Sequence, residues 1–338
     1  MAAHATSSAG ARTSARDARI EIELGAAIVT VEDDQPQILV TSGATDTNGW
    51  DTLPSGPFSP HDHRTLELGL RRWVKEQTQL DLGYVEQLYT FGDYGRHSDS
   101  GRRNIHTVSI GYLALVAHGS DAQMSGAHWS PWYSYMPWED WRNGKPKLLD
   151  EEIEPRLREW SGRKALPGEP ERGLTRKERL RVCFAIGGGN WDDEKVLERY
   201  ELLYEAGLVS KAARDGREAA LQWSGLTPFG RPMQHDHRRI LATAIGRLRA
   251  KLKYRPVVFE LLPETFTLYE LQKMVEAIHG AHVHKQNFRR LVESGGLVEP
   301  TNAVSTATGG RPARLYRFRR EVLLERPAPG VRIKVGRG

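Results

Sequence analysis

The chain has 338 residues, of which 27% are charged, and its formal net charge at pH 7 is +5. A chain of this length can form two domains, each with its own hydrophobic core. No apolar run approaches the roughly 18 residues of a membrane-spanning helix, and the single cysteine, Cys183, excludes an intramolecular disulfide. We therefore expect a cytoplasmic protein that has no membrane partner.

The first part of the chain changes character at about residue 18. Residues 1–18 are rich in Ala, Ser and Thr and lack the apolar core of a secretory signal, so we expect a disordered tail. Beyond it, strand-like and helix-like patterns alternate. The predicted strands cover residues 19–24, 26–31, 37–40, 85–91 and 106–116, and the predicted helix covers residues 65–79. This pattern indicates a mixed α/β domain, residues 19–145, built on strands around one central helix.

The middle segment, residues 146–245, is predicted to be a helical connecting region. Residues 192–207 and 234–253 both have apolar side chains at helical spacing. Just before this segment, six Trp and Tyr residues crowd between positions 129 and 141. Such residues are more often packed in a core than arranged as a ligand-binding wall, so we expect packing.

Residues 246–338 have the pattern of a winged helix-turn-helix. Thr267 and Glu270 have the spacing of a capping box, and Gly280 can end the helix that they begin. A second helix follows after a short turn. Residues 297–299 and 314–318 then suit the two strands of a hairpin, which would be the wing.

The second helix of this unit is predicted to contact DNA. Its polar side chains project together, because residues three and four positions apart share a helix face. The amino-terminal end of such a helix enters the major groove, and the wing contacts phosphate or the adjacent minor groove. The predicted DNA-binding residues are Lys285, Gln286, Asn287, Arg289, Arg290, Thr267, Arg311 and Arg314.

The distribution of charge agrees with DNA binding. Residues 246–338 contain 18 Lys and Arg against 8 Asp and Glu, whereas the residues before them contain 30 against 35. Positive charge concentrated in one module is typical of a nucleic-acid-binding domain joined to another domain. Two-fold symmetric operators favour dimers, so we expect a homodimer with its interface in residues 146–245, although a spacer within one chain would have the same pattern.

Residues 53–80 resemble a Nudix box whose pattern is broken. The matching residues are Arg72, Val74, Glu76 and Leu80. The resemblance implies catalytic or metal-binding glutamates where this chain has Trp73 and Gln77. A Nudix site clusters several carboxylates around Mg²⁺, and such a cluster cannot form here as the family builds it. We therefore expect no catalytic residues, no metal site and no cofactor.

The chain also resembles the Nudix-related transcriptional regulators of bacteria. The resemblance rests on residues 87–93, 108–116, 254–263, 266–272, 287–290 and 309–318. These regulators join a Nudix-like sensor to a winged helix, and the chain is similar to a longer form that represses NAD biosynthesis. The resemblance implies an α+β chain with a degenerate Nudix-like α/β domain, a helical connecting region and a C-terminal winged helix-turn-helix.

The function implied by this resemblance is ligand-responsive repression of NAD biosynthesis or salvage genes. The implied partners are operator DNA and an adenine nucleotide, NAD or ADP-ribose. The predicted effector-binding residues are Arg72, Glu76, Arg96, Arg102 and Arg103, of which the last three can grip phosphate through charge-assisted hydrogen bonds. The alternatives are a sugar-responsive regulator of the same architecture, a Nudix hydrolase that also binds DNA, and an RNA-binding scaffold. The missing carboxylates disfavour the hydrolase, and the lack of an aromatic platform disfavours RNA.

Overall fold

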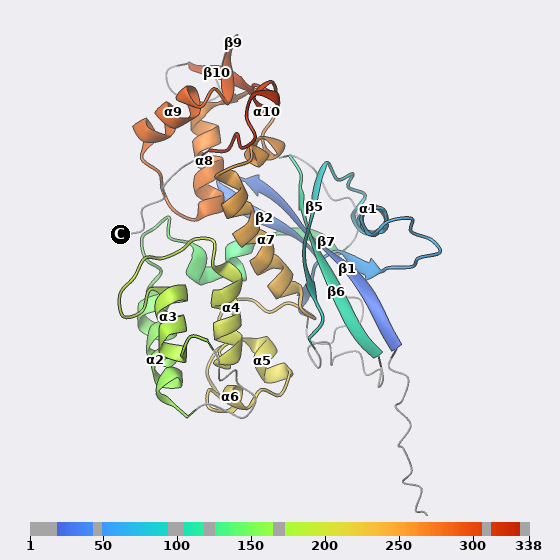
Figure 1. Cartoon of the computed structure of the whole chain (residues 1–338), viewed down its shortest axis with the longest axis vertical. Helices are drawn as coiled ribbons and strands as arrows, with labels where there is room; N and C mark the ends of the chain where they lie inside the picture. Colours follow the sequence, from blue (N-terminus) through green and yellow to red (C-terminus); the bar gives the residue numbers. More distant parts are fainter. Residues whose placement is uncertain are drawn as a thin grey trace, which may run out of the picture.

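A computed structural model describes residues 19–42, 49–93, 105–117, 126–164, 173–305 and 312–331 of the chain. Within these ranges a mixed sheet and a group of short helices lie on opposite sides of a long helix, α7, and a small winged unit lies at one end (Figure 1). The predicted tail, residues 1–18, lies outside the described residues.

The sheet has seven strands, in the order β3-β2-β1-β6-β5, with β4 paired to β1 and β7 paired to β2. Its strands are β1 (Arg19–Glu32), β2 (Gln35–Ser42), β3 (Asp51–Thr52), β4 (Ser55–Pro57), β5 (Tyr84–Phe91), β6 (Ile105–Leu115) and β7 (Ala127–Pro131). The two strands predicted at residues 19–24 and 26–31 form one strand. Gly25 does not interrupt it, because Gly25 continues the parallel ladder opposite Gly111.

One face of the sheet packs against helix α1 (Leu66–Thr78), the helix predicted at residues 65–79. Alternate residues of a strand point to opposite faces, and Ala26 and Ile28 of β1 join Leu70 and Val74 of α1 in one hydrophobic cluster. The spacing of the apolar residues on α1 is therefore explained by this sheet face.

The opposite face packs against helix α7 (His237–Leu252). Val29 of β1 and Leu113 of β6 share a second cluster with Ile240 of α7. The approach is close, since a Cβ added to Gly111 would lie 3.0 Å from Ile240 Cγ2. The sheet is thus sandwiched between α1 and α7.

This sandwich changes the expected domain organisation. The sequence predicts that residues 234–245 belong to a connecting region and that the DNA-binding domain begins at residue 246. That boundary falls inside the continuous helix α7, which completes the sheet domain. Residues 132–236 are therefore an insertion between β7 and α7, and one helix on each face replaces the single central helix that we predicted.

The described part of the insertion folds into short helices. They are α2 (Glu154–Gly162), α3 (Arg176–Phe184), α4 (Val196–Glu205), α5 (Ser210–Arg214) and α6 (Glu218–Leu221), together with 3-10 turns at Trp132–Ser134 and Pro137–Glu139 and a π-helical turn at Leu149–Ile153. Trp132 and Trp138 are fully buried, which confirms packing for the aromatic segment. The helix predicted from residue 192 begins only at Val196, because Asp192 instead accepts a hydrogen bond from Glu194 N at 3.0 Å and forms a turn.

The winged unit follows α7 through a 3-10 turn at Val257–Leu261. It contains α8 (Leu268–His279), α9 (Lys285–Ser294), α10 (Val322–Glu325) and a sheet in the order β8-β10-β9, formed by β8 (Phe266–Thr267), β10 (Ala313–Phe318) and β9 (Val298–Ser305). Two helices followed by a hairpin confirm the predicted winged helix-turn-helix.

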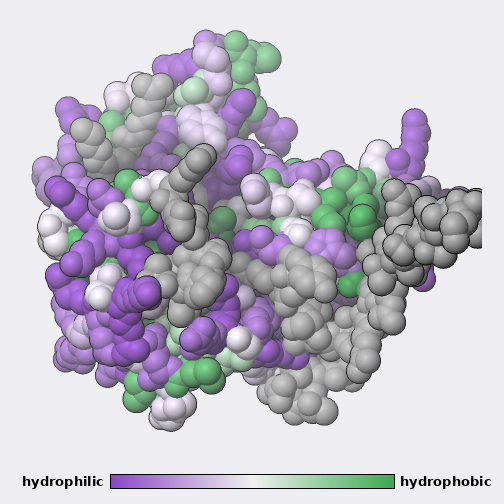
Figure 2. Space-filling view, turned by 60° about the horizontal axis from the view of Figure 1, so that its bottom comes forward, coloured by the Kyte–Doolittle hydropathy of each residue, from purple (hydrophilic) through white to green (hydrophobic). Residues whose placement is uncertain are grey.

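On the face shown in Figure 2, most of the coloured surface is hydrophilic, and the hydrophobic residues gather in a few small groups. Within the described residues, no helix combines the length and the apolar character needed to span a bilayer.

Candidate functional site

Helix α8 begins with the predicted capping box. Thr267 Oγ1 accepts a hydrogen bond from Glu270 N at 3.1 Å, and Glu270 Oε2 accepts one from Thr267 N at 2.6 Å. Thr267 is only 2% exposed and also belongs to β8, opposite Leu315. The structure therefore assigns the Thr267 side chain to the helix cap, which corrects its expected role as a DNA contact.

Helix α9 has one buried side and one exposed polar side. Phe288 is 1% exposed and Val292 is 0% exposed, so these two residues fix the helix on the unit. The other predicted DNA-binding residues of the helix are all exposed, and they are Lys285, Gln286, Asn287, Arg289 and Arg290. Arg290 Nη2 donates to Asn287 Oδ1 at 3.1 Å, whereas no ion pair involving Lys285 or Arg289 is formed with the described residues. The helix thus presents uncompensated positive charge to solvent.

The wing adds further basic side chains beside this helix. Arg314 is exposed on β10, opposite Val304 of β9. Arg317 on the same strand is paired with Glu299, with 2.5 Å between Nε and Oε1, so its charge is partly neutralised. Arg311, the other arginine predicted to contact DNA from the wing, lies outside the described residues.

The carboxyl end of α8 is held by a buried polar network that sequence reasoning did not find. Glu139 is fully buried and accepts hydrogen bonds from two fully buried arginines, Arg199 Nε and Arg249 Nη1, both at 2.6 Å. Arg249 Nε also donates to Ile278 O of α8 at 3.0 Å. One carboxylate therefore ties α4, α7 and the last turn of α8 together.

The residue that ends α8 fits tightly against this network. Gly280 has φ of +69°, the left-handed conformation expected from the sequence, and its carbonyl accepts a hydrogen bond from Trp141 N at 2.6 Å. Tyr133 Oη donates to Ala277 O at 2.7 Å. The insertion thus forms hydrogen bonds with backbone carbonyls at the end of α8, and these bonds fix the winged unit to the insertion.

A hydrogen bond between the buried His279 and the partly buried Asp193 lies beside the same turn. His279 Nδ1 is 2.7 Å from Asp193 Oδ2. Burial lowers the pKa of His279, against the opposing effect of the Asp193 carboxylate. Burial would raise the pKa of Asp193, but the hydrogen bond from His279 and the positive charges of Arg249 and Lys253 hold it well below its usual range. A neutral His279 therefore donates to an ionised Asp193 at pH 7.

The residues at the broken Nudix positions hold β4 in place. Gln77 Nε2 donates to Ser55 O at 2.6 Å, and Gln77 Oε1 accepts from Ser55 N at 3.2 Å. Trp73 Nε1 donates to Pro57 O at 2.9 Å, and a Cβ on Gly56 would overlap the Trp73 indole. Both side chains thus form hydrogen bonds with the backbone of residues 55–57. In a complete Nudix box these two positions would carry glutamates.

The predicted effector-binding residues are only partly described. Arg72 and Glu76 lie on the exposed side of α1 and pair with each other at 2.8 Å, with 57% and 48% of their side chains exposed. Arg96, Arg102 and Arg103 lie outside the described residues. The common site of Arg72, Glu76 and the three other arginines therefore stays a prediction.

A polar cluster at the amino-terminal end of α7 was also missed by sequence reasoning. Glu23 of β1 accepts hydrogen bonds from Ser55 Oγ at 3.0 Å and Ser109 Oγ at 3.4 Å, and its Oε1 is 4.0 Å from His237 Nε2. Its members come from four separate elements, so no local spacing could reveal it. Across the described ranges, no group of three or more His, Cys, Asp or Glu side chains is arranged to hold a metal ion.

The carboxy-terminal part of the chain matches a known family. Residues 258–318 match the model of the NrtR DNA-binding winged helix domain. The chain is also similar to the "ADPR responsive transcriptional repressor NtrR" of Acinetobacter baylyi, with 43% identity over 83 residues. That match covers 25% of this chain and spans about a third, 33%, of the length of the curated relative.

Solved structures with the same fold cover more of the chain. The structure of Shewanella oneidensis NrtR complexed with a 27mer DNA has a TM-score of 0.53 and 21% identity, covering 89% of this chain and 94% of that one. A second structure of the Shewanella oneidensis protein has a TM-score of 0.52 and 22% identity, covering 89% of this chain and 95% of that one. The chain therefore has the same overall fold as the Shewanella oneidensis NrtR structures, and its residues 258–318 are similar to the NrtR DNA-binding winged helix domain.

Proposed function

We propose that this protein is a ligand-responsive transcriptional repressor that binds operator DNA through α9 and the wing. The observation that carries the proposal is the polar side of α9, where Lys285, Gln286 and Arg289 are exposed around a buried Phe288. A recognition helix places such side chains against base edges in the major groove. Arg314 on β10, together with Arg311, would then contact phosphate or the adjacent minor groove.

The effector proposed here is an adenine nucleotide-type metabolite, with ADP-ribose as the first candidate. The support is the printed name of the Acinetobacter baylyi relative, an ADPR responsive repressor. Arg72, Glu76, Arg96, Arg102 and Arg103 remain the proposed effector-binding residues. A ligand can shift DNA binding only if its affinities for the DNA-bound and free states differ. The resemblance stated above implies genes of NAD biosynthesis or salvage as the targets.

We further propose that the protein regulates without catalysing Nudix hydrolysis. Neither Trp73 nor Gln77 has a carboxylate to offer Mg²⁺. Both side chains instead bind the backbone of residues 55–57. The purified protein is expected to show no Mg²⁺-dependent turnover of ADP-ribose or NAD above that of a Glu76→Gln variant. Turnover well above this control would identify an enzyme.

The proposed organisation is a homodimer in the cytoplasm, with a sensor, a helical insertion and a winged helix. The sensor comprises residues 19–131 and α7, the insertion comprises residues 132–236, and the DNA-binding unit begins after α7. Sedimentation of the full chain tests the dimer, since a monomer at micromolar concentration with and without operator would contradict it.

The DNA interface is tested with the full chain and its own operator, which is identified by sequencing the genomic fragments that the purified protein retains. Arg289→Ala and Arg314→Ala are compared with Arg158→Ala, which removes an exposed arginine on α2. Loss of a base contact should cost about 1–3 kcal/mol and relax specificity, and loss of a phosphate contact should reduce the salt slope by about one. If both interface variants bind as the Arg158→Ala control does, α9 and the wing are not the DNA interface.

Effector binding is tested separately by calorimetry of the full chain with ADP-ribose, NAD and ATP. Arg72→Ala should weaken the binding, whereas Lys75→Ala, which removes an exposed charge from the same helix, should not. Binding of a sugar with no heat from any of the three nucleotides would move the protein to the sugar-responsive class. DNA binding by α9 would stand in either case.

A further inference from the structure

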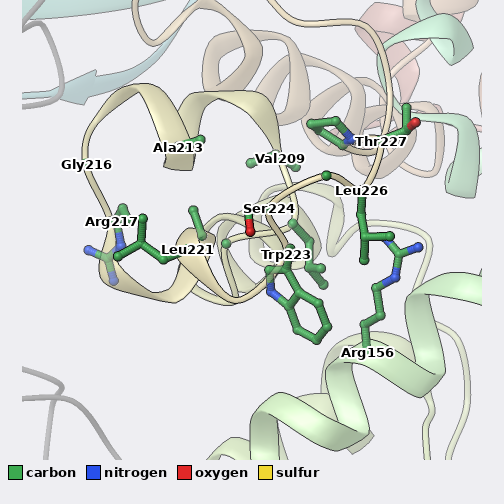
Figure 3. Close-up of a pocket in the computed structure, with 15 residues that line it drawn as sticks. Arg156, Val209, Ala213, Gly216, Arg217, Leu221, Trp223, Ser224, Leu226 and Thr227 are labelled. Carbon is green, nitrogen blue, oxygen red and sulfur yellow. The ribbon is translucent and has the colours of Figure 1, made fainter.

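A pocket of about 320 Å³ opens in the inserted segment, at the opposite end of the molecule from the wing (Figures 1 and 3). Arg156 of α2 lines one side, and the turn before α5, α5, α6 and the loop after α6 line the rest. Small-molecule sites have volumes of roughly 300–1,000 Å³, so the pocket can hold a compact ligand. None of its residues was among the predicted site residues.

The wall of this pocket is mainly apolar and is built around one fixed aromatic ring. Trp223 is 9% exposed, and its Nε1 donates to Ala206 O at 2.6 Å, which holds the indole in one orientation. The remaining apolar lining comes from Leu208, Val209, Ala213, Ala220, Leu221, Leu226 and Pro228. A ring that is already held in place loses little conformational freedom when a flat ligand packs on it.

The charged groups of the pocket all have the same sign. Arg156 and Arg217 line it, and none of the described lining residues is an Asp or Glu. Figure 3 shows the two arginines on either side of Trp223. Their positive charge makes the pocket favourable for an anion and unfavourable for a cation.

Both arginines keep donors for a ligand. Arg217 lies over the Tyr204 ring at 5.2 Å and forms no ion pair with the described residues. Arg156 lies over the Phe229 ring at 4.9 Å, and its one ion pair with the described residues joins its Nη2 to Glu152. A guanidinium has five N–H donors in a fixed fork, so a single contact with Glu152 leaves the others for a second acceptor.

We propose that this pocket is a binding site for a small organic anion with an apolar ring. The ring packs against Trp223 and the aliphatic lining, and the anionic group accepts charge-assisted hydrogen bonds from Arg217 and Arg156. The site lies outside both the sheet domain and the winged unit. The proposed site is therefore independent of the proposed DNA binding and of the proposed nucleotide sensing.

Two fluorescent probes that share one ring system test the proposal. The first is 8-anilinonaphthalene-1-sulfonate, and the second is N-phenyl-1-naphthylamine, which lacks the sulfonate. Titrations of the full chain should show one saturable site for the sulfonate probe and weaker binding of the neutral probe. Arg217→Gln and Arg156→Gln should each weaken the sulfonate probe by about tenfold, the factor expected for one lost hydrogen bond to a charged group.

Two further variants separate the pocket from other surfaces. Arg158→Gln removes a cation from the same helix as Arg156, is 55% exposed and should leave both probes unaffected. Ser224→Glu adds an acid to the exposed lining and should weaken the sulfonate probe while leaving the neutral probe almost unchanged. Equal affinities of the two probes, or sulfonate binding that none of the pocket variants weakens, would overturn the proposal.

Discussion

Replacing Gly280 with Ala is expected to weaken the junction between the winged unit and the insertion. At φ of +69° a residue with a Cβ is strained by about 1–2 kcal/mol. The added Cβ would also lie 2.6 Å from Tyr133 Oη and closer still to Glu139 O. Forcing an atom into a packed site costs about 1–3 kcal/mol more. The two effects together predict a loss of about 2–5 kcal/mol in the free energy of unfolding.

A second glycine provides the matched control. Gly216 has the same φ, +69°, but no described atom lies within 4 Å of the position where its Cβ would be placed. Gly216→Ala should therefore cost only the backbone strain, about 1–2 kcal/mol. Urea unfolding followed by circular dichroism measures both variants, and operator titration shows whether the Gly280 variant also loses DNA affinity. Equal destabilisation by the two substitutions would refute the argument that close packing at Gly280 fixes the winged unit.

Three other substitutions test separate parts of the structure. Glu139→Gln leaves Arg199 and Arg249 buried without a carboxylate and should cost about 3–5 kcal/mol in urea unfolding, whereas Glu159→Gln, in an exposed pair with Arg163, should change it by less than about 1 kcal/mol. Gln77→Glu should lower the free energy of unfolding by about 1–3 kcal/mol, because a carboxylate cannot donate to Ser55 O. The same variant should restore no hydrolysis. Stability equal to that of Glu76→Gln would contradict the expected loss. The lowered pKa of His279 means that the unfolded chain takes up its proton first, so stability should fall as the pH drops below about 6.5. His279→Gln should flatten that part of the stability profile, and an unchanged slope would assign the pH dependence to other groups.

The winged unit could be predicted in detail because its signals are local. The capping box at Thr267, the helix end at Gly280 and the exposed polar side of α9 all depend on residues a few positions apart. The same local reading failed for the Thr267 side chain, since its burial depends on the pairing of β8 with β10. Local spacing therefore predicts elements better than it predicts which side chains remain accessible.

Helix α7 shows why the rest could not be predicted. Its sequence has apolar residues at helical spacing, but nothing in that spacing shows that its partner is a sheet that ended more than 100 residues earlier. Arg249, which is fully buried, looks like a surface residue because its acceptor, Glu139, lies far away in the chain. Arg238 is equally misleading, since it is 2% exposed and burial lowers its pKa to about 10.

The insertion between β7 and α7 also has a consequence for the order in which the nascent chain can fold. All the strands of the main sheet have been synthesised by Pro131, but α7 ends at Leu252. At about 5–20 residues per second, synthesis of the intervening chain takes roughly 6–24 s. During that interval the apolar sheet face containing Val29 and Leu113 has no α7 to cover it. A newborn chain of this protein should therefore depend on chaperones most strongly while its insertion is being translated.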